Sequence, residues 1–340
     1  MFRCFELGRV CKIKSVLLKT VFCVVIDINS VLERGKLMEK RDFQITNPAS
    51  SKEITRAYFD SLLVEERLMD SCVPVTDFEL YGKQFKTPIM TAALSHIGTF
   101  NPDMPSGMVQ YAQGAAMAGA VHWIGMGSDE EFESVIAAGA PTIRIIKPYA
   151  DEEKIYGQIR CAERCGALAV GMDIDHMLDL KGEPDVCMGE LMAVKSSEDL
   201  KRYVECTKLP FIIKGVLSVH DALKCVEIGV RGIVVSHHGG RLNYAVPPLY
   251  VLPDIVKAVG DKMPIFVDCG ICSGMDAYKA LALGATAVSV GLHLIPMIRQ
   301  GGAEGVAKRI QEMTEEMKGV MAYTGVASPK HFDASVIHRL

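Results

Sequence analysis

The feature that most constrains the fold of this chain is an eightfold alternation of short apolar runs with longer segments of helical spacing. In the longer segments, such as GMVQYAQGAAMAGA and GMDAYKALALGA, apolar residues recur every three or four positions. Most of these segments end in Gly just before the next apolar run, as loops from helix to strand prefer. The apolar runs are PIMTAAL (88–94), AVHWIGMG (120–127), TIRIIKP (142–148), ALAVGMDI (167–174), PFIIKGV (210–216), GIVVSHH (232–238), PIFVDCG (264–270) and TAVSVGL (286–292).

Apolar strands joined in this way by helices predict a parallel sheet that is covered on both faces. Eight such units favour an α/β fold of the TIM-barrel type, in which a single domain forms a closed (β/α)8 barrel. A doubly wound open sheet is the alternative. The count of eight and the regular spacing of the units favour the barrel.

Composition places the chain among ordinary globular proteins and argues against two classes of function. The 340 residues are 49% hydrophobic and 23% charged, with a formal net charge of -4. Because there is no basic run and only one Trp, the sequence does not support nucleic-acid binding. The 11 Cys residues lack the paired Cys and His spacing of a zinc site, so we expect no metal and a reducing compartment such as the cytoplasm.

The first 40 residues differ from the rest and are interpreted as an N-terminal extension that need not belong to the native chain. Their apolar stretch, residues 15–28, is interrupted by Lys19 and is too short to span a bilayer. No small-residue cleavage site follows it. Met38 is an alternative start, because the segment that follows it reads like the opening of a folded domain. We therefore expect the barrel domain within residues 41–340 and no association with a membrane.

Polar side chains gather where the predicted strands end. In a (β/α)8 barrel the catalytic residues lie at the carboxyl ends of the strands. A charged residue that closes an apolar strand is costly unless it is paired or used in chemistry. Convergence from several strands is harder to explain by structure alone than a single such residue. The set comprises Arg144 and Lys147 on the third run, Asp173 and Asp175 at the fourth, Lys214 on the fifth, Ser236, His237, His238 and Arg241 at the sixth, and Asp268 on the seventh.

Three of these segments carry a likeness to a known family. They are LPFIIKGV (209–216), GIVVSHHGGRLNYAVPPL (232–249) and PIFVDCGICSGMDAYKALALGATAVSVG (264–291). In this order and register they resemble the FMN-dependent α-hydroxy-acid oxidases and dehydrogenases. The likeness covers about residues 50–335, and the pairing of K-G-V with S-x-H-G-G-R and D-x-G…KALALGA makes it specific.

The resemblance implies catalytic roles for three residues. His238 matches the general base that takes a proton from the substrate, and Arg241 matches the arginine that binds the substrate carboxylate. Asp173 matches the carboxylate that orients the histidine, although Asp175 competes for that role. The residue types suit the chemistry, since imidazole titrates near neutrality and a guanidinium binds a carboxylate through a two-bond fork.

The resemblance also implies FMN as the cofactor. Lys214 matches the lysine beside the N1 and O2 edge of the flavin, where an ammonium stabilises the reduced ring. The implied reaction is oxidation of a small L-2-hydroxy acid to the 2-oxo acid, in a homo-oligomer that the family likeness makes a tetramer. The electron acceptor is not indicated. The other residues implied in cofactor binding are Ala92, Ser95, Ser236, Asp268, Gly270 and Gly291.

The sequence departs from the family at the phosphate end of the cofactor. Cys272 and Leu292 stand where the family has two phosphate-binding arginines, and Cys269 replaces a glycine. Losing two charge-assisted contacts, at about 1.5–3 kcal/mol each, weakens FMN binding by orders of magnitude. The helix start at Ser273 is a candidate phosphate site. His293 and Arg299 are candidate replacements for the lost charge.

Two further features bear on the substrate. Arg144 is a candidate substrate-binding residue; it is expected either to pair with Asp173 or to replace a missing phosphate contact. The loop at about 175–196, with its acidic DHMLDLKGEPD run, is shorter than the lid of the family and is expected to be a solvated surface loop.

These observations leave three hypotheses about function. The first is an FMN-dependent 2-hydroxy-acid oxidase or dehydrogenase. The second is a degenerate member of the family that binds FMN weakly or not at all and serves as a non-catalytic barrel, as the missing arginines favour. The third is another FMN barrel, of the type 2 isopentenyl diphosphate isomerase kind, which the spacing of H-G-G-R disfavours.

Overall fold

The computed structural model describes residues 50–101 and 103–340. The expected N-terminal extension, its boundary at residue 40 and the alternative start at Met38 lie outside these residues.

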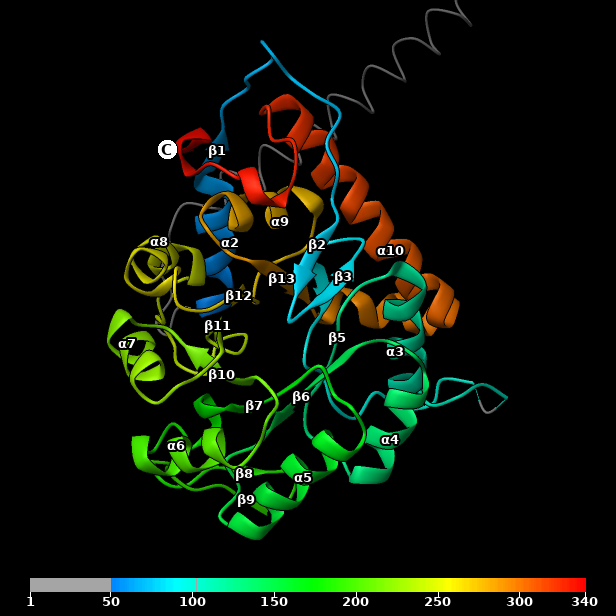
Figure 1. Ribbon diagram of the computed structural model, residues 1–340, viewed down its shortest axis with the longest axis vertical. Helices are drawn as coiled ribbons and strands as arrows, with labels where there is room; N and C mark the ends of the chain where they lie inside the picture. Colours follow the sequence, from blue (N-terminus) through cyan, green and yellow to red (C-terminus); the bar gives the residue numbers. More distant parts are fainter. Residues whose placement is uncertain (1–49, 102) are drawn as a thin grey trace, which may run out of the picture. The chain divides into compact units, whose positions relative to one another are not determined.

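Eight parallel strands form the barrel in the order β4-β13-β12-β11-β10-β7-β6-β5 (Figure 1). The ring is completed between β4 and β5, where Leu94 forms a parallel bridge with Ile124 and its carbonyl accepts from the Gly125 N–H at 2.9 Å. All eight predicted strands are present, and the TIM-barrel prediction is confirmed. They are β4 (Ile89–Thr91), β5 (His122–Ile124), β6 (Thr142–Ile146), β7 (Ala169–Asp173), β10 (Phe211–Val216), β11 (Gly232–Val235), β12 (Ile265–Val267) and β13 (Ala287–Val290).

The segments of helical spacing between the apolar runs are helices and surround the strands (Figure 1). Several begin at a serine whose hydroxyl accepts the N–H three residues on, which satisfies one of the free donors of the first turn. Ser196 and Asp199, for example, form a reciprocal capping box. The helices are α3 (Gly107–Ala118), α4 (Asp129–Ala137), α5 (Glu152–Arg164), α6 (Ser197–Glu205), α7 (Val219–Glu227), α8 (Pro248–Val259) and α9 (Gly274–Ala282).

Two apolar cores hold these layers together. One fills the barrel, where the rings of Trp123 and Phe266 meet edge to face at 5.3 Å. A hairpin of β2 (Phe78–Leu80) and β3 (Lys83–Phe85) adds its apolar side chains to this core. The hairpin covers the amino ends of the strands, because the Tyr81 hydroxyl donates to the Arg231 carbonyl just before β11. The second core lies between strands and helices. The carboxyl ends are left for the functional groups.

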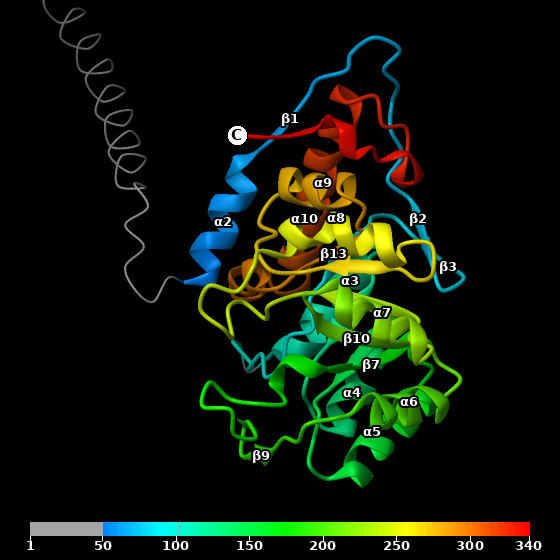
Figure 2. The same ribbon diagram turned by 90° about the vertical axis from the view of Figure 1, so that its left-hand side faces the viewer.

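The remaining elements close the domain. The C-terminus lies beside β1 (Leu62–Val64), because β14 (Ile337–Arg339) pairs with it antiparallel (Figures 1 and 2). No helix in the described part of the chain is long and apolar enough to cross a membrane. The other elements are α2 (Ser51–Ser61), β8 (Val186–Cys187), β9 (Glu190–Leu191), α10 (Ile295–Tyr323, interrupted at Gly302) and the 3-10 turns η1 (Ile174–His176), η2 (Leu292–Leu294), η3 (Pro329–His331) and η4 (Ala334–Val336).

Candidate active site

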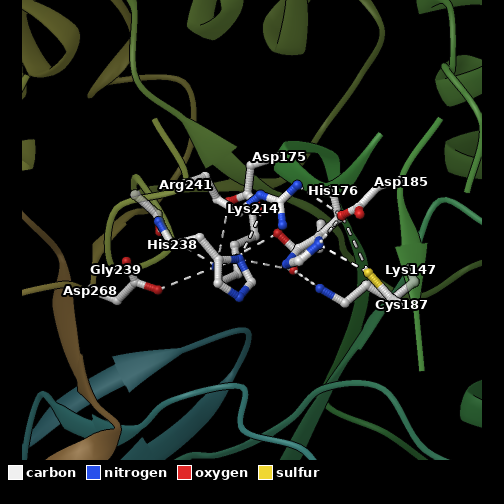
Figure 3. A network of polar contacts seen from close by, with 12 residues as sticks. Lys147, Asp175, His176, Asp185, Cys187, Lys214, His238, Gly239, Arg241 and Asp268 are labelled. Carbon is white, nitrogen blue, oxygen red and sulfur yellow. Dashed lines mark hydrogen bonds and ion pairs between the residues drawn. The ribbon is translucent and has the colours of Figure 1, made fainter. Parts of the chain in front are cut away.

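Lys214, at the carboxyl end of β10, is the centre of a polar cluster (Figure 3). Its ammonium is buried and lies 3.6 Å from Asp173 Oδ1, 3.5 Å from Asp268 Oδ2 and 3.8 Å from Asp175 Oδ2. It also donates to Ser236 Oγ at 3.4 Å. Burial alone lowers the pKa of this lysine, but the three carboxylates outweigh burial and hold the pKa above its ordinary value. Lys214 is therefore a permanently charged group.

His238 follows β11 and lies against Lys214 (Figure 3). Its Nδ1 is 2.8 Å from Asp175 Oδ1, 3.3 Å from Asp173 Oδ2 and 3.1 Å from Lys214 Nζ. Burial and the Lys214 charge lower the pKa of His238, but the two carboxylates prevail and raise it above its ordinary value. The imidazole is thus held by charged partners on its Nδ1 side.

The backbone at His238 explains the two glycines that follow it. His238 has φ 52°, in the left-handed region where a side chain is strained, and Gly239 and Gly240 follow at φ 71° and 104°. Three successive left-handed residues turn the chain sharply at the end of β11. The His238 N–H donates to Ser236 Oγ at 3.0 Å, which fixes this turn. The sequence S-H-H-G-G is therefore a device for holding His238 at the strand end.

Lys147 is a second buried lysine in the cluster, at the end of β6. Its ammonium is 2.6 Å from Asp173 Oδ2. Burial raises the pKa of Asp173, but the charges of Lys214, His238 and Lys147 outweigh it and hold the pKa well below its ordinary value. Asp173 is thus a permanent carboxylate shared by three cationic or titratable groups. From the sequence, Lys147 was only one of several charged strand-end residues and had no assigned role.

Arg241 is held by the loop between β7 and α6. Its Nη2 donates to Asp185 Oδ2 at 2.8 Å and to the Leu178 carbonyl at 2.9 Å. The same Asp185 oxygen lies 2.8 Å from Nδ1 of His176, whose ring meets that of His238 edge to face at 4.5 Å. Much of the expected surface loop at 175–196 is exposed, including Leu180 and Lys181, but its Asp185 and His176 side chains reach the site (Figure 3). The acidic character of the run gave no sign of this.

Two cavities meet at His238. One, of about 460 Å³, is lined by Asp179, Leu180, Asp185 and the His238–Arg241 turn. The other, also about 460 Å³, lies over the carboxyl ends of β4, β10, β12 and β13 and is lined by Lys214, His237 and Asp268 among others. His238 and Gly239 line both. A group in one cavity and a group in the other would therefore both contact the imidazole.

Some, but not all, of the residues implied in cofactor binding line the second cavity. Ala92, Gly270 and Gly291 line it beside Lys214 and Asp268. Ser236 is buried behind Lys214, and Ser95 does not line the cavity. Volumes of this size are typical of ligand sites, and a buried ammonium with close backbone at the glycines suits a planar anionic ring. The ring end of the cavity therefore fits a flavin.

Among the residues that the structure describes, none forms a preformed phosphate clamp at the other end of this cavity. Cys272 and Leu292 line it, together with Lys52, Arg56 and His293. Arg56 makes two hydrogen bonds to Asp276, at 3.0 and 2.9 Å, which neutralise it in part. The cations present fit the phosphate of FMN as a group, although less closely than two dedicated arginines.

Two sequence-based expectations for the phosphate are not supported. The N–H groups of Gly274 and Met275, at the start of α9, donate to the Glu316 carboxylate at 2.7 and 3.3 Å, so the helix start near Ser273 holds an anion of the protein itself. The Arg299 guanidinium stacks on Phe100 at 5.3 Å and does not line the cavity. His293 does line it.

Arg144 lies away from the cluster. Side chains alternate along a strand, and Ile143 and Ile145 occupy the barrel core. Arg144 therefore faces the helices, where its Nη2 is 2.8 Å from Asp129 and its guanidinium stacks on Phe132 at 4.6 Å. The structure thus pairs Arg144 with Asp129, not with Asp173, and gives it no contact in either cavity.

Replacing Arg144 by alanine is expected to lower the free energy of unfolding by about 2–3 kcal/mol, because the buried stem and ion pair are lost. The FMN dissociation constant should not change. Thermal and denaturant unfolding together with FMN titration measure both. Asp129→Asn is the matched variant: it leaves the Arg144 guanidinium, which is 2% exposed, without its counter-ion, so it should also lower the free energy of unfolding and leave FMN binding unchanged. Weakened FMN binding with unchanged stability would contradict this placement.

Comparison with known proteins agrees with this geometry. Residues 44–195 and 186–339 match the family model described as FMN-dependent dehydrogenase. Glycolate oxidase of Spinacia oleracea is 28% identical over 323 residues, covering 83% of this chain and 86% of that protein. L-lactate oxidase of Alicycliphilus denitrificans is 30% identical over 309 residues, covering 80% and 84%. A mandelate oxidase variant solved with an FMN adduct superimposes with a TM-score of 0.76 at 28% identity, covering 86% of this chain and 92% of that one. The chain therefore belongs to the family of FMN-dependent α-hydroxy-acid oxidases and dehydrogenases.

Proposed function

We propose that this protein is an FMN-dependent oxidoreductase that oxidises a small L-2-hydroxy acid to the 2-oxo acid. The observation that carries the proposal is the position of His238 on the border of two cavities, one with a buried lysine and one with an arginine. This arrangement lets a single imidazole contact a substrate while the substrate also faces a flavin.

Arg241 is the proposed anchor of the substrate carboxylate. Only its Nη2 is engaged, by Asp185 and the Leu178 carbonyl. Within residues 50–101 and 103–340, Nε and Nη1 have no hydrogen-bond partner, so each can donate a single hydrogen bond to a carboxylate. A charge-assisted hydrogen bond of this kind is roughly twice as strong as one between neutral groups. The hydroxyl-bearing carbon would then lie near His238, three residues back along the same turn.

His238 is the proposed base, with Nε2 accepting a proton of the substrate while Nδ1 faces the carboxylates. FMN, when bound, supplies the acceptor for the two electrons that leave the substrate. Lys214, Asp268, Ala92, Gly270 and Gly291 would hold its ring and chain, and Lys52, Arg56 and His293 its phosphate. The buried ammonium of Lys214 places a fixed positive charge where negative charge develops.

A second candidate function is a family member that binds FMN weakly and does no chemistry. The phosphate end favours it, since Cys272 and Leu292 supply no charge and the start of α9 is occupied by Glu316. The intact cluster around Lys214 and His238 disfavours it.

The proposal includes a setting for the enzyme. All eight cysteines of the described residues are free, which supports a reducing compartment such as the cytoplasm. Exposed apolar side chains in the loop between β7 and α6, including Leu180 and Met188, support a homo-oligomer.

The deciding measurement is the visible spectrum of the purified protein with added FMN, followed by anaerobic addition of L-lactate and glycolate. The expected result is a protein-bound flavin spectrum that bleaches with a hydroxy acid. A flavin that binds but does not bleach would reject the substrate class. If no flavin binds even at high FMN concentration, the oxidoreductase function is wrong and the non-catalytic reading holds.

A further inference from the structure

Nδ1 of His238 has two partners that demand opposite protonation. In its ionised form the carboxylate of Asp175, at 2.8 Å, can only accept a hydrogen bond and so requires a proton on Nδ1, although burial and the charge of Asp173 raise the pKa of Asp175. The ammonium of Lys214, at 3.1 Å, can only donate and so requires a bare Nδ1. The neutral imidazole has one proton, so one partner prevails. The outcome decides whether Nε2 is a free base or already carries the proton.

Asp173, which the family likeness makes the orienting carboxylate, is poorly placed to decide this. Its Oδ2 is 3.3 Å from His238 Nδ1 but 2.6 Å from the ammonium of Lys147. Its Oδ1 lies 3.6 Å from Lys214. Oδ2 is thus hydrogen-bonded to Lys147, and the shorter contact to His238 Nδ1 is the one made by Asp175.

Asp175 has few contacts other than the one with His238. Its Oδ1 is hydrogen-bonded to His238, while its buried Oδ2 has no hydrogen-bond partner in the described part of the chain and lies 3.8 Å from Lys214. The side chain is 13% exposed. It packs against Gly215, where an added Cβ would lie 2.9 Å from Asp175 Oδ2. The glycine after Lys214, at φ 99°, therefore also makes room for this carboxylate.

We propose that Asp175, and not Asp173, is the positioning residue of His238: it fixes the tautomer with the proton on Nδ1, against Lys214, and leaves Nε2 free to act as a base. Asp173 is less suited to this role because its Oδ2 is hydrogen-bonded to Lys147. The inference rests on the proposed function for its consequence in catalysis, but the tautomer itself does not depend on turnover.

The test is nitrogen NMR of the FMN-loaded protein carrying ¹⁵N-histidine, at a pH above the pKa of His238. The His238 signals are assigned as those missing from His238→Gln. Wild type is expected to show a protonated Nδ1 and a bare Nε2. In Asp175→Ala the pattern should reverse, because Lys214 then donates to Nδ1, and flavin reduction by substrate should slow by roughly 100-fold. Adding Lys147→Met to Asp175→Ala frees Asp173 and should restore the wild-type pattern.

Asp268→Asn is the matched control. It removes a carboxylate charge 3.5 Å from Lys214 but leaves the carboxylate that is hydrogen-bonded to His238, so it should keep the wild-type tautomer. If Asp175→Ala does not fold, Asp175→Asn replaces it. The rise of the flavin-reduction rate with pH, the acid limb of its pH profile, should then occur at lower pH, because a carboxylate that raises the pKa of His238 is lost. An unchanged tautomer in Asp175→Ala, or an acid limb that moves only in Asp173→Asn, would overturn the proposal. Should no hydroxy acid reduce the wild-type flavin, the proposed function fails while the tautomer result still decides this inference.

Discussion

Replacing His238 by glutamine is expected to slow substrate-dependent flavin reduction by roughly 1,000-fold, within the 100- to 10,000-fold range of a lost general base. Glutamine is close to histidine in size and keeps polar atoms in the turn, so bound FMN should stay in place. The rate of flavin bleaching after anaerobic mixing with a hydroxy acid measures the effect. The FMN dissociation constant, measured separately, should change little, because Lys214 and the cavity walls remain.

The pH profile gives this prediction a second readout. His238 must be neutral to accept a proton, so activity should rise with pH through its pKa. The neighbouring carboxylates raise that pKa above its ordinary value of about 6.5, so the acid limb should lie above this pH. In His238→Gln flavin bleaching should be slow at every pH, so the rise with pH should be absent. A variant that bleaches at the wild-type rate would show that another group is the base, and His176 would then be examined first. Burial and the Lys147 charge lower its pKa to about 4, so it is neutral at working pH.

The barrel was predictable because its strands are buried on both faces. A parallel strand between a filled barrel and a layer of helices has no solvent face, so it appears as an unbroken apolar run. The hairpin of β2 and β3 was missed because its strands, FEL and KQF, are not unbroken apolar runs and are too short to show a period. The pairing of β1 with β14 joins positions such as Leu62 and Arg339. No local pattern encodes a contact across that distance.

The site was only partly predictable, for reasons of register and charge. Lys214, His238 and Asp173 converge because each ends a neighbouring strand. Arg144 lies on β6 and Lys147 directly follows this strand, and a sequence alone does not say which one faces the site. The odd-numbered Ile143 and Ile145 fill the barrel, so the next odd position, Lys147, continues inward while Arg144 faces outward. Asp185 was unpredictable because its partner, Arg241, comes from a distant loop.

The phosphate end of the cofactor cavity decides between an enzyme and an inherited scaffold. Leu292 lines this cavity, is 61% exposed and begins η2 directly after Gly291. An exposed leucine can be replaced by a charged residue at little cost in stability. The position is therefore suited to a gain of function, in which the variant acquires an interaction that the wild-type chain lacks.

Leu292→Arg is expected to tighten FMN binding by roughly 10- to 150-fold, since a charge-assisted hydrogen bond contributes about 1.5–3 kcal/mol. Fluorescence titration of the flavin measures the dissociation constant. Riboflavin, which lacks the phosphate, should bind both proteins equally, so a gain for FMN alone locates the new contact at the phosphate. Leu223→Arg, at a 45% exposed position on α7 outside the cavity, controls for added charge and should change neither constant. An equal gain in FMN affinity from Leu292→Arg and Leu223→Arg would show that the effect comes from the added positive charge and not from a contact with the phosphate. An unchanged FMN affinity in Leu292→Arg would place the phosphate elsewhere in the cavity, beside Lys52 or Arg56.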